Sequence, residues 1–157
     1  MRRLVMWGTA LSALGGLAAA PPAGAGTQRP PEADLAYHGW AAMTGGRMEV
    51  TLTPGNHGPS PVPEAAVRLR WSEPLAGRQS LPPGCVRTGE RELVCRTGQL
   101  AADAVGERIA VAVRLADRPS EVRLLVDTVW GGGTVDRNRG NDRQQVLVLD
   151  TGDPYSF

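Results

Sequence analysis

Alternation of apolar and polar residues recurs along most of this chain and limits what it can fold into. A period of two places successive side chains on opposite faces of a β-strand, so each alternating stretch predicts a strand with one buried face. Met48, Val50 and Leu52 alternate with polar residues in this way, as do Val67, Leu69 and Trp71. The stretches that predict strands are residues 34–39, 48–53, 67–71, 92–96, 108–115, 122–127 and 146–149.

About seven strands separated by turn residues predict an all-β fold, an immunoglobulin-like antiparallel β-sandwich over residues 33–150. The only plausible helical residues, 100–104, form too short a segment to matter. Residues 54–65 and 72–84 are rich in proline and glycine, and we expect each to cross between the two sheets. Outside the sandwich we expect a flexible linker at 26–32 and a C-terminal tail at 151–157.

The first 25 residues have the order of a secretory signal peptide. Arg2 and Arg3 precede an apolar run from Leu4 to Ala20, and small residues and prolines follow. We expect cleavage after Ala25, which leaves 157 − 25 = 132 residues and a secreted, extracellular product. The alternative is an uncleaved membrane anchor, but the Pro/Gly-rich segment after Ala20 continues a helix poorly.

Charge argues against a nucleic-acid partner. The chain has 17 basic residues, all arginine, and 16 acidic ones, so loss of Arg2 and Arg3 leaves 15 − 16 = −1. A nearly neutral chain holds neither nucleic acid nor a membrane surface by bulk charge. The arginines are scattered along the sequence, which does not indicate a phosphate site. We expect a monomer with no membrane contact after cleavage.

The two cysteines, Cys85 and Cys95, predict a disulfide because an exported chain meets an oxidising compartment. Nine residues lie between them, with a turn near Thr88-Gly89-Glu90, so the bond would clip a local hairpin or join a strand to its neighbouring loop. Closing so short a loop contributes roughly 3 kcal/mol to stability.

Four motifs occur in a recognisable order: Asn56-His57-Gly58-Pro59-Ser60, the pair Cys85 and Cys95, Gly98-Gln99-Leu100-Ala101-Ala102, and Asp136-x-Asn138-x-x-Asn141. In this order they resemble a single copy of the bacterial conserved-repeat domain known as domain of unknown function eleven. The resemblance covers roughly residues 33–150. It implies an immunoglobulin-like sandwich in a secreted or cell-surface protein, with turn roles for Asn56, Gly58, Pro59, Asp136, Asn138 and Asn141.

The chemical alternatives are catalysis, copper and calcium. His57 and Ser60 could begin a nucleophilic site, but no nucleophile-elbow motif accompanies them. His38, Met43, Met48 and His57 could bind copper, although Met48 belongs to the inward-facing set. The segment 135–142 resembles a calcium loop, yet counting from Asp136 the fifth, sixth and twelfth positions fail the EF-hand pattern. We expect its polar side chains to bond turn backbone, with Gly140 at positive φ.

These observations predict a non-enzymatic module, without a cofactor, that contacts a protein or glycan at the cell surface. Trp40, Trp71 and Trp130 could form a sugar-stacking platform if they shared one face. The alternatives are a secreted protease inhibitor that presents the Cys85–Cys95 loop as a substrate mimic, and a weak binder of calcium or copper.

Overall fold

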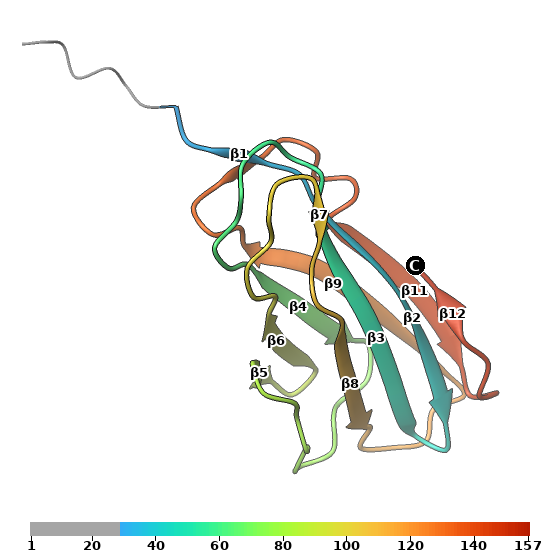
Figure 1. Ribbon diagram of the computed structural model, residues 1–157. Coiled ribbons are helices and arrows are strands. Elements are labelled where there is room, and N and C mark those ends of the chain that lie inside the picture. Colours follow the sequence, from blue (N-terminus) through green and yellow to red (C-terminus); the bar gives the residue numbers. More distant parts are fainter. Residues whose placement is uncertain (1–28) are drawn as a thin grey trace, which may run out of the picture.

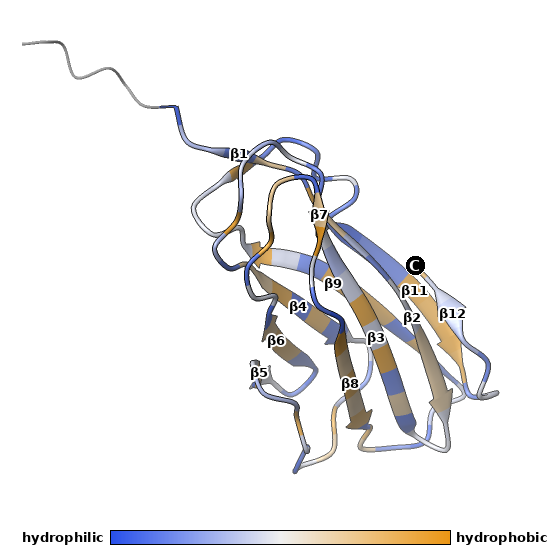
Figure 2. Ribbon diagram, viewed as in Figure 1, coloured by the Kyte–Doolittle hydropathy of each residue, from blue (hydrophilic) through white to orange (hydrophobic). Residues whose placement is uncertain are grey.

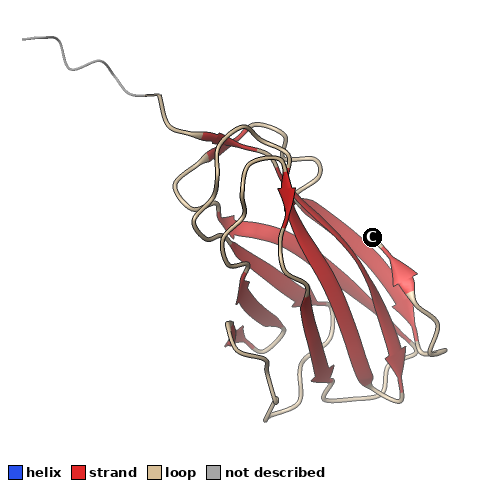
Figure 3. Cartoon of the chain, viewed as in Figure 1, coloured by secondary structure: helices blue, strands red, loops and turns tan. Residues whose placement is uncertain are grey.

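The structure is a computed structural model that describes residues 29–157, so the expected signal peptide lies outside the described residues. Over residues 29–157 the chain forms strands and no helix (Figure 3), which confirms the all-β prediction. The strands are β1 (Glu32–Ala33), β2 (Leu35–Thr44), β3 (Arg47–Asn56), β4 (Ala66–Trp71), β5 (Cys85–Gly89), β6 (Glu92–Arg96), β7 (Ala104–Val105), β8 (Ile109–Arg114), β9 (Glu121–Trp130), β10 (Val135–Asp136), β11 (Arg143–Leu149) and β12 (Tyr155–Ser156).

The longer strands form two antiparallel sheets packed face to face (Figure 1), which confirms the predicted sandwich. One sheet, called here the β9 sheet, has the strand order β11-β9-β4-β6-β5. The other, the β3 sheet, has the order β12-β2-β3, and both β7 and β8 pair with β3. A short parallel pair, β1 with β10, lies at the end where the β3–β4 loop and β7 gather (Figure 1).

The alternation in the sequence supplies the core between the sheets. On β3, Met48, Val50 and Leu52 are buried while the residues between them point outward. Figure 2 shows this alternation as polar and apolar bands along the strands. Trp71 of β4 reaches across the core, where its indole N–H donates to Met48 Sδ at 3.1 Å. Burial of each such apolar side chain contributes about 1.5–3 kcal/mol, so the facing sheets stabilise one another.

Each of the seven predicted stretches lies on a strand of the structure, and β5 is the longer strand that the alternation did not predict. In β5 only Cys85 is buried, so this strand carries no two-residue pattern to detect. It pairs with β6, and Cys85 lies directly opposite Cys95. The predicted disulfide between them is present and links neighbouring strands of one hairpin.

The prediction that residues 72–84 cross between the sheets is wrong, because β4 and β5 belong to the same β9 sheet. The segment instead leaves that sheet, contacts the β3 sheet and returns. Leu75 forms an isolated bridge with Leu115, and Ala76 N–H donates to Arg114 O at 2.8 Å. Buried Leu75 anchors this excursion to the core. The other predicted crossing does join the two sheets, between β3 and β4.

The sandwich also extends past its expected boundaries at 33 and 150. Glu32, the last residue of the expected linker, already pairs with Val135. At the other end, β12 pairs with β2, and Gly39 and Phe157 exchange two backbone hydrogen bonds of 3.0 Å. Tyr155 and Phe157 pack against the core, which is why the expected tail forms an edge strand of the β3 sheet.

Candidate functional site

A shallow groove crosses the outward face of the β3 sheet. Its floor is the row Ala42, Glu49 and Ala112, which lie in register on β2, β3 and β8. Because the alanine side chains on both sides of Glu49 are small, the surface over this row is recessed below its surroundings. Trp40 lies at one end of the groove, two residues before Ala42 on β2, and Arg47 with Arg114 lie at the other end, beyond Glu49 and Ala112. We call the surface formed by these six residues the transverse groove.

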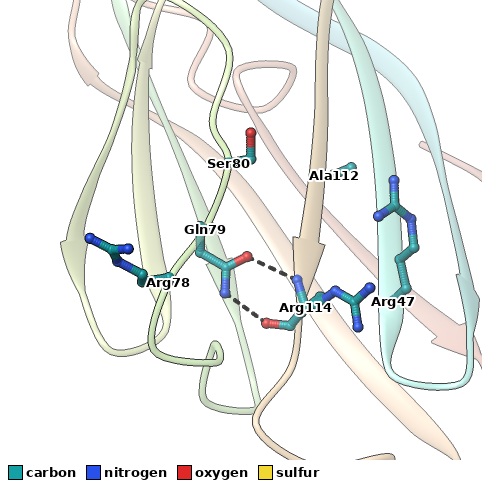
Figure 4. A pocket seen from close by; sticks show the side chains of 6 residues that line it. All are labelled: Arg47, Arg78, Gln79, Ser80, Ala112 and Arg114. Atoms are coloured by element: carbon teal, nitrogen blue, oxygen red, sulfur yellow. Dashed lines mark hydrogen bonds between the residues drawn. The ribbon is translucent and has the colours of Figure 1, made fainter.

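The arginine end of the transverse groove opens into a cleft of about 910 Å³. Figure 4 shows the cleft from close by, with the Arg114 side chain extending toward Arg47 and Arg78 projecting to the opposite side. The residues that line it are Arg47, Arg78, Gln79, Ser80, Ala112 and Arg114. Arg47 and Arg114 therefore border the cleft on one side, and this concentration of positive charge favours an anion.

Arg47 and Arg114 lie directly opposite each other on β3 and β8. Arg114 N–H and C=O both bond to Gln79 on the far side of β8, so this cross-strand pair is of the non-hydrogen-bonded type, in which side chains approach most closely. Like charges in such a position are destabilising. Within residues 29–157, Arg47 has one ion-pair partner, Glu49 at 3.4 Å, and Arg114 has none.

Gln79 closes the edge of the β3 sheet at this point. Its side-chain amide accepts a hydrogen bond from Arg114 N–H and donates one to Arg114 O, both at 2.9 Å (Figure 4). The amide thus occupies the two backbone groups that an added strand would use at Arg114. This contact fixes the segment 78–80 beside β8 and forms one wall of the cleft.

The opposite end of the transverse groove is aromatic. Trp40 on β2 is 36 % exposed and lines a hollow of about 460 Å³ together with Ala42, Glu49, Gly152, Pro154 and Ser156. An indole ring of this kind offers an apolar body and a polar N–H to a ligand. The groove therefore combines an aromatic surface and a carboxylate with two arginines on neighbouring strands.

Arginines on the outward face of the β9 sheet are arranged differently. Arg68 lies in register with Asp127, and two of its guanidinium nitrogens donate to that carboxylate. This bond with Asp127 is the main cause that raises the pKa of Arg68. Arg70 lies in register with Glu92 and bonds to its carboxylate at 3.2 Å. Each of these arginines thus forms an ion pair with an acidic residue of its own sheet. Within residues 29–157, Arg114 and Arg78 form no ion pair.

The motif residues predicted to form turns lie at the end of the sandwich near β1. Asn56 is fully buried and its amide makes four hydrogen bonds, accepting from Asp34 N–H and Gly58 N–H and donating to Ser60 O and Ala101 O. A Cβ on Gly58 would lie 2.5 Å from Ala33 Cα, so only glycine fits there. Pro59 follows it, exposed at the surface.

The segment 135–142 uses its polar oxygens on the chain itself. Asp136 accepts the N–H groups of Leu35 at 2.8 Å and Asn138 at 2.9 Å, and Asn141 donates to Asp34 Oδ1 at 2.8 Å. Over residues 29–157 no group of three or more His, Cys, Asp or Glu side chains is arranged to hold a metal ion. The expected positive φ at Gly140 is wrong.

Left-handed backbone occurs earlier in the same connection, at Gly132 with φ 68° and Gly133 with φ 80°. Those two glycines make the sharp turn after β9, so the later Gly140 is not needed in that conformation. A Cβ on Gly132 would also lie 2.5 Å from Glu64 O, which makes the position tight.

Asp142 is a buried carboxyl group at the edge of this network, 1 % exposed. Arg139 Nη1 lies 3.0 Å from Asp142 Oδ2, but within the described part of the chain neither carboxyl oxygen receives a hydrogen bond. Burial raises the pKa of Asp142 above its ordinary value, and the nearby Arg139 charge opposes the rise. Burial likewise raises the pKa of Tyr37 to about 12, and its hydroxyl bonds to Thr128 Oγ1 at 2.7 Å.

The Cys85–Cys95 segment is a hairpin bound into the β9 sheet. Its Arg87 is tied down, because the guanidinium donates to the carbonyl groups of Leu75, Ala76, Gly77, Gly89 and Glu90. A substrate mimic must offer a free side chain to the pocket of a protease, and the Arg87 side chain is not free. This geometry gives the inhibitor hypothesis no support.

The structure does not bring the other candidate sets together. Met43 and Met48 are buried in the core while His38 and His57 are exposed, so the proposed copper ligands do not converge. Ser60 Oγ accepts Glu32 N–H at 3.2 Å and, within residues 29–157, forms no bond with His57. Among the tryptophans, Trp71 is in the core, and Trp40 and Trp130 are on different sheets. Of the three, Trp40 alone borders the groove.

Comparison with known proteins identifies no relative. No family model matches the chain, and neither a curated protein nor a solved structure matches it. The resemblance to the conserved-repeat domain therefore stays a prediction that rests on its four motifs. Over residues 29–157 the chain also contains no helix that is long and apolar enough to cross a membrane.

Proposed function

We propose that this protein is a secreted, non-enzymatic immunoglobulin-like module that contacts a glycan or protein at the bacterial cell surface. The single observation that supports the proposal best is the transverse groove, which lies across a sheet face and combines aromatic, carboxylate and guanidinium groups. A sheet packed on a continuous core fixes the backbone positions from which these side chains extend, and a preorganised backbone binds with less loss of conformational entropy.

A glycan suits the shape of the groove. Sugars bind proteins through polar hydroxyl groups and through the apolar faces of their rings, and Trp40 supplies an exposed indole for such stacking. Glu49, with a side chain 54 % exposed, can accept hydrogen bonds from sugar hydroxyl groups. The outward alanines leave room for a chain-like ligand to lie across the strands.

Location at the cell surface rests on two features of the chain. The first 25 residues have the pattern of a signal peptide, and the Cys85–Cys95 disulfide suits an oxidising compartment. Mass spectrometry of protein from the culture medium tests this part, because cleavage after Ala25 and the loss of two hydrogens should both appear. A product retained in the cytoplasm with two free thiols would contradict it.

Binding to isolated cell-wall material tests the contact role. We expect the secreted protein to sediment with walls from its own producing cells and the variant Trp40→Ala to do so several-fold less. Trp130→Ala, which removes an exposed tryptophan from the other sheet, is the matched control and should leave binding unchanged. Equal binding by all three proteins, or none by any, would overturn the proposal.

A further inference from the structure

Two arginines occupy directly opposed positions on neighbouring strands, and one of them, Arg114, has no acidic partner within residues 29–157. Arg47 and Arg114 are directly opposite across β3 and β8, and Arg78 lines the same cleft. Glu49 pairs with Arg47 alone, over 3.4 Å, with both side chains more than half exposed. An anion held between Arg47 and Arg114 would offset the repulsion that a like-charged cross-strand pair produces.

We propose that the transverse groove binds an acidic polysaccharide, with a carboxylate or sulfate group between Arg47 and Arg114 and a neutral sugar ring stacked on Trp40. The proposal rests on the contact role argued above and names the chemical class of the partner. The groove has the length for such a ligand. Trp40 lies in register with Thr51 and Ala110, and Ala110 lies four residues before Arg114 on β8. Strand spacing and rise place Trp40 roughly 17 Å from Arg114, which is a span for an oligosaccharide and not for one small ion.

The charge pattern also sets where the acidic group must lie. Glu49 occupies the middle of the floor, where its carboxylate would repel a second anion. The guanidinium groups stand at one end only. The ligand should therefore carry its acid on the unit at the arginine end and neutral units over Glu49 and Trp40, as a polymer with acidic and neutral units would.

An acidic peptide fits this place less well than a glycan. Extended peptides usually bind a sheet by adding a strand to its edge, through backbone hydrogen bonds. At Arg114 both backbone groups of the edge strand are already bonded to Gln79. The groove moreover ends at an indole ring, which favours ring stacking over strand pairing.

The experiment compares two polymers with the same backbone, partly methyl-esterified polygalacturonate, which carries both acidic and neutral units, and the fully methyl-esterified form, by affinity electrophoresis or calorimetry with the secreted protein. We expect binding to the acidic form, weaker at high salt because the contact is exposed. Arg47→Ala and Arg114→Ala should each weaken it about tenfold, the effect of one lost charge-assisted hydrogen bond. Arg70→Ala removes an arginine of the β9 sheet that is already paired with Glu92, and should leave binding unchanged.

Each other outcome overturns a defined part of the reasoning. Equal binding of both polymers, with loss in Trp40→Ala alone, would leave the contact role standing and refute the acidic ligand. Polyglutamate that binds as tightly as the partly esterified polygalacturonate, without dependence on Trp40, would assign the groove to an acidic peptide. An equal loss in Arg70→Ala would show a nonspecific charge effect. Failure to bind both walls and polymers would refute the contact role itself.

Discussion

Removing the Asn56 side chain should destabilise the whole sandwich. The Asn56 amide is fully buried and joins three separate segments, since it bonds to Asp34, to Gly58 and Ser60, and to Ala101. Asn56→Ala leaves two N–H groups and two carbonyl groups without these partners. The change tests whether a residue placed in a turn by its motif holds the end of the fold together.

The magnitude follows from the four hydrogen bonds, which range from 2.9 to 3.3 Å. A net contribution of about 1 kcal/mol for each gives a loss of about 4 kcal/mol for Asn56→Ala. A domain of ordinary stability, about 5–15 kcal/mol, would survive that loss. The melting temperature should fall by roughly 10 °C or more.

Urea unfolding followed by tryptophan fluorescence measures the change, with Asn138→Ala as the control. Asn138 is exposed and its amide donates one long bond, 3.3 Å, to Asp34 Oδ1, so its loss should cost less than about 1 kcal/mol. Asn56→Asp separates the two halves of the network. The aspartate keeps both acceptor contacts but places an oxygen atom against Ser60 O and Ala101 O. Its loss of unfolding free energy relative to the wild type should therefore be smaller at acid pH, where the protonated carboxyl group can donate one hydrogen bond.

Equal stability of Asn56→Ala and Asn138→Ala would refute this reasoning, because it would mean that the four bonds are replaced at no cost by water. If the stability lost in Asn56→Asp did not change with pH, the two hydrogen bonds donated by the Asn56 amide would not contribute to stability as expected. Either result would reduce Asn56 to a local turn residue.

Asn56 also illustrates what the sequence could and could not predict. Its motif indicated a turn, and the structure places it at the end of β3 beside one. The bond to Ala101 joins residues 45 positions apart, and no local pattern could predict it. Strands were predictable because burial of one face imposes a period of two on each of them separately. The path of residues 72–84 was not, because proline and glycine exclude helix and central strand without saying which sheet comes next.

The candidate site was missed for the same reason. Alternation alone places Arg47 and Arg114 on outward faces, as it places Arg68 and Arg70. Whether an outward arginine meets an acid or another arginine depends on strand order and register, and these are set by long-range packing. The arginines are scattered in the sequence, yet the β3–β8 register brings two of them together. A sequence signal would have required the pairing of those two strands to be known beforehand.

Three further predictions concern stability, each measured by urea unfolding. Replacing both Cys85 and Cys95 by serine should lower the free energy of unfolding by about 3 kcal/mol, because the unfolded chain gains conformational entropy without the disulfide. Reduction of the wild type should lower it equally, and a loss below about 1 kcal/mol would contradict this prediction. Because burial raises the pKa of Asp142 above its ordinary value of 3.8, its contribution to stability is present below pH 3.8 and is lost as the pH rises through the raised pKa. The free energy of unfolding of Asp142→Asn should therefore increase relative to that of the wild type as the pH rises from 3.8 toward 7. Parallel plots of unfolding free energy against pH for the two proteins would contradict this prediction. Arg114→Glu should stabilise the protein by up to about 1 kcal/mol at low salt, since it places a carboxylate directly opposite Arg47 in a non-hydrogen-bonded pair. The gain should fade as salt rises and should disappear when Arg47 is also replaced by alanine. If it persisted without Arg47, the repulsion between the two guanidinium groups, and with it the argument for an anion between them, would be wrong.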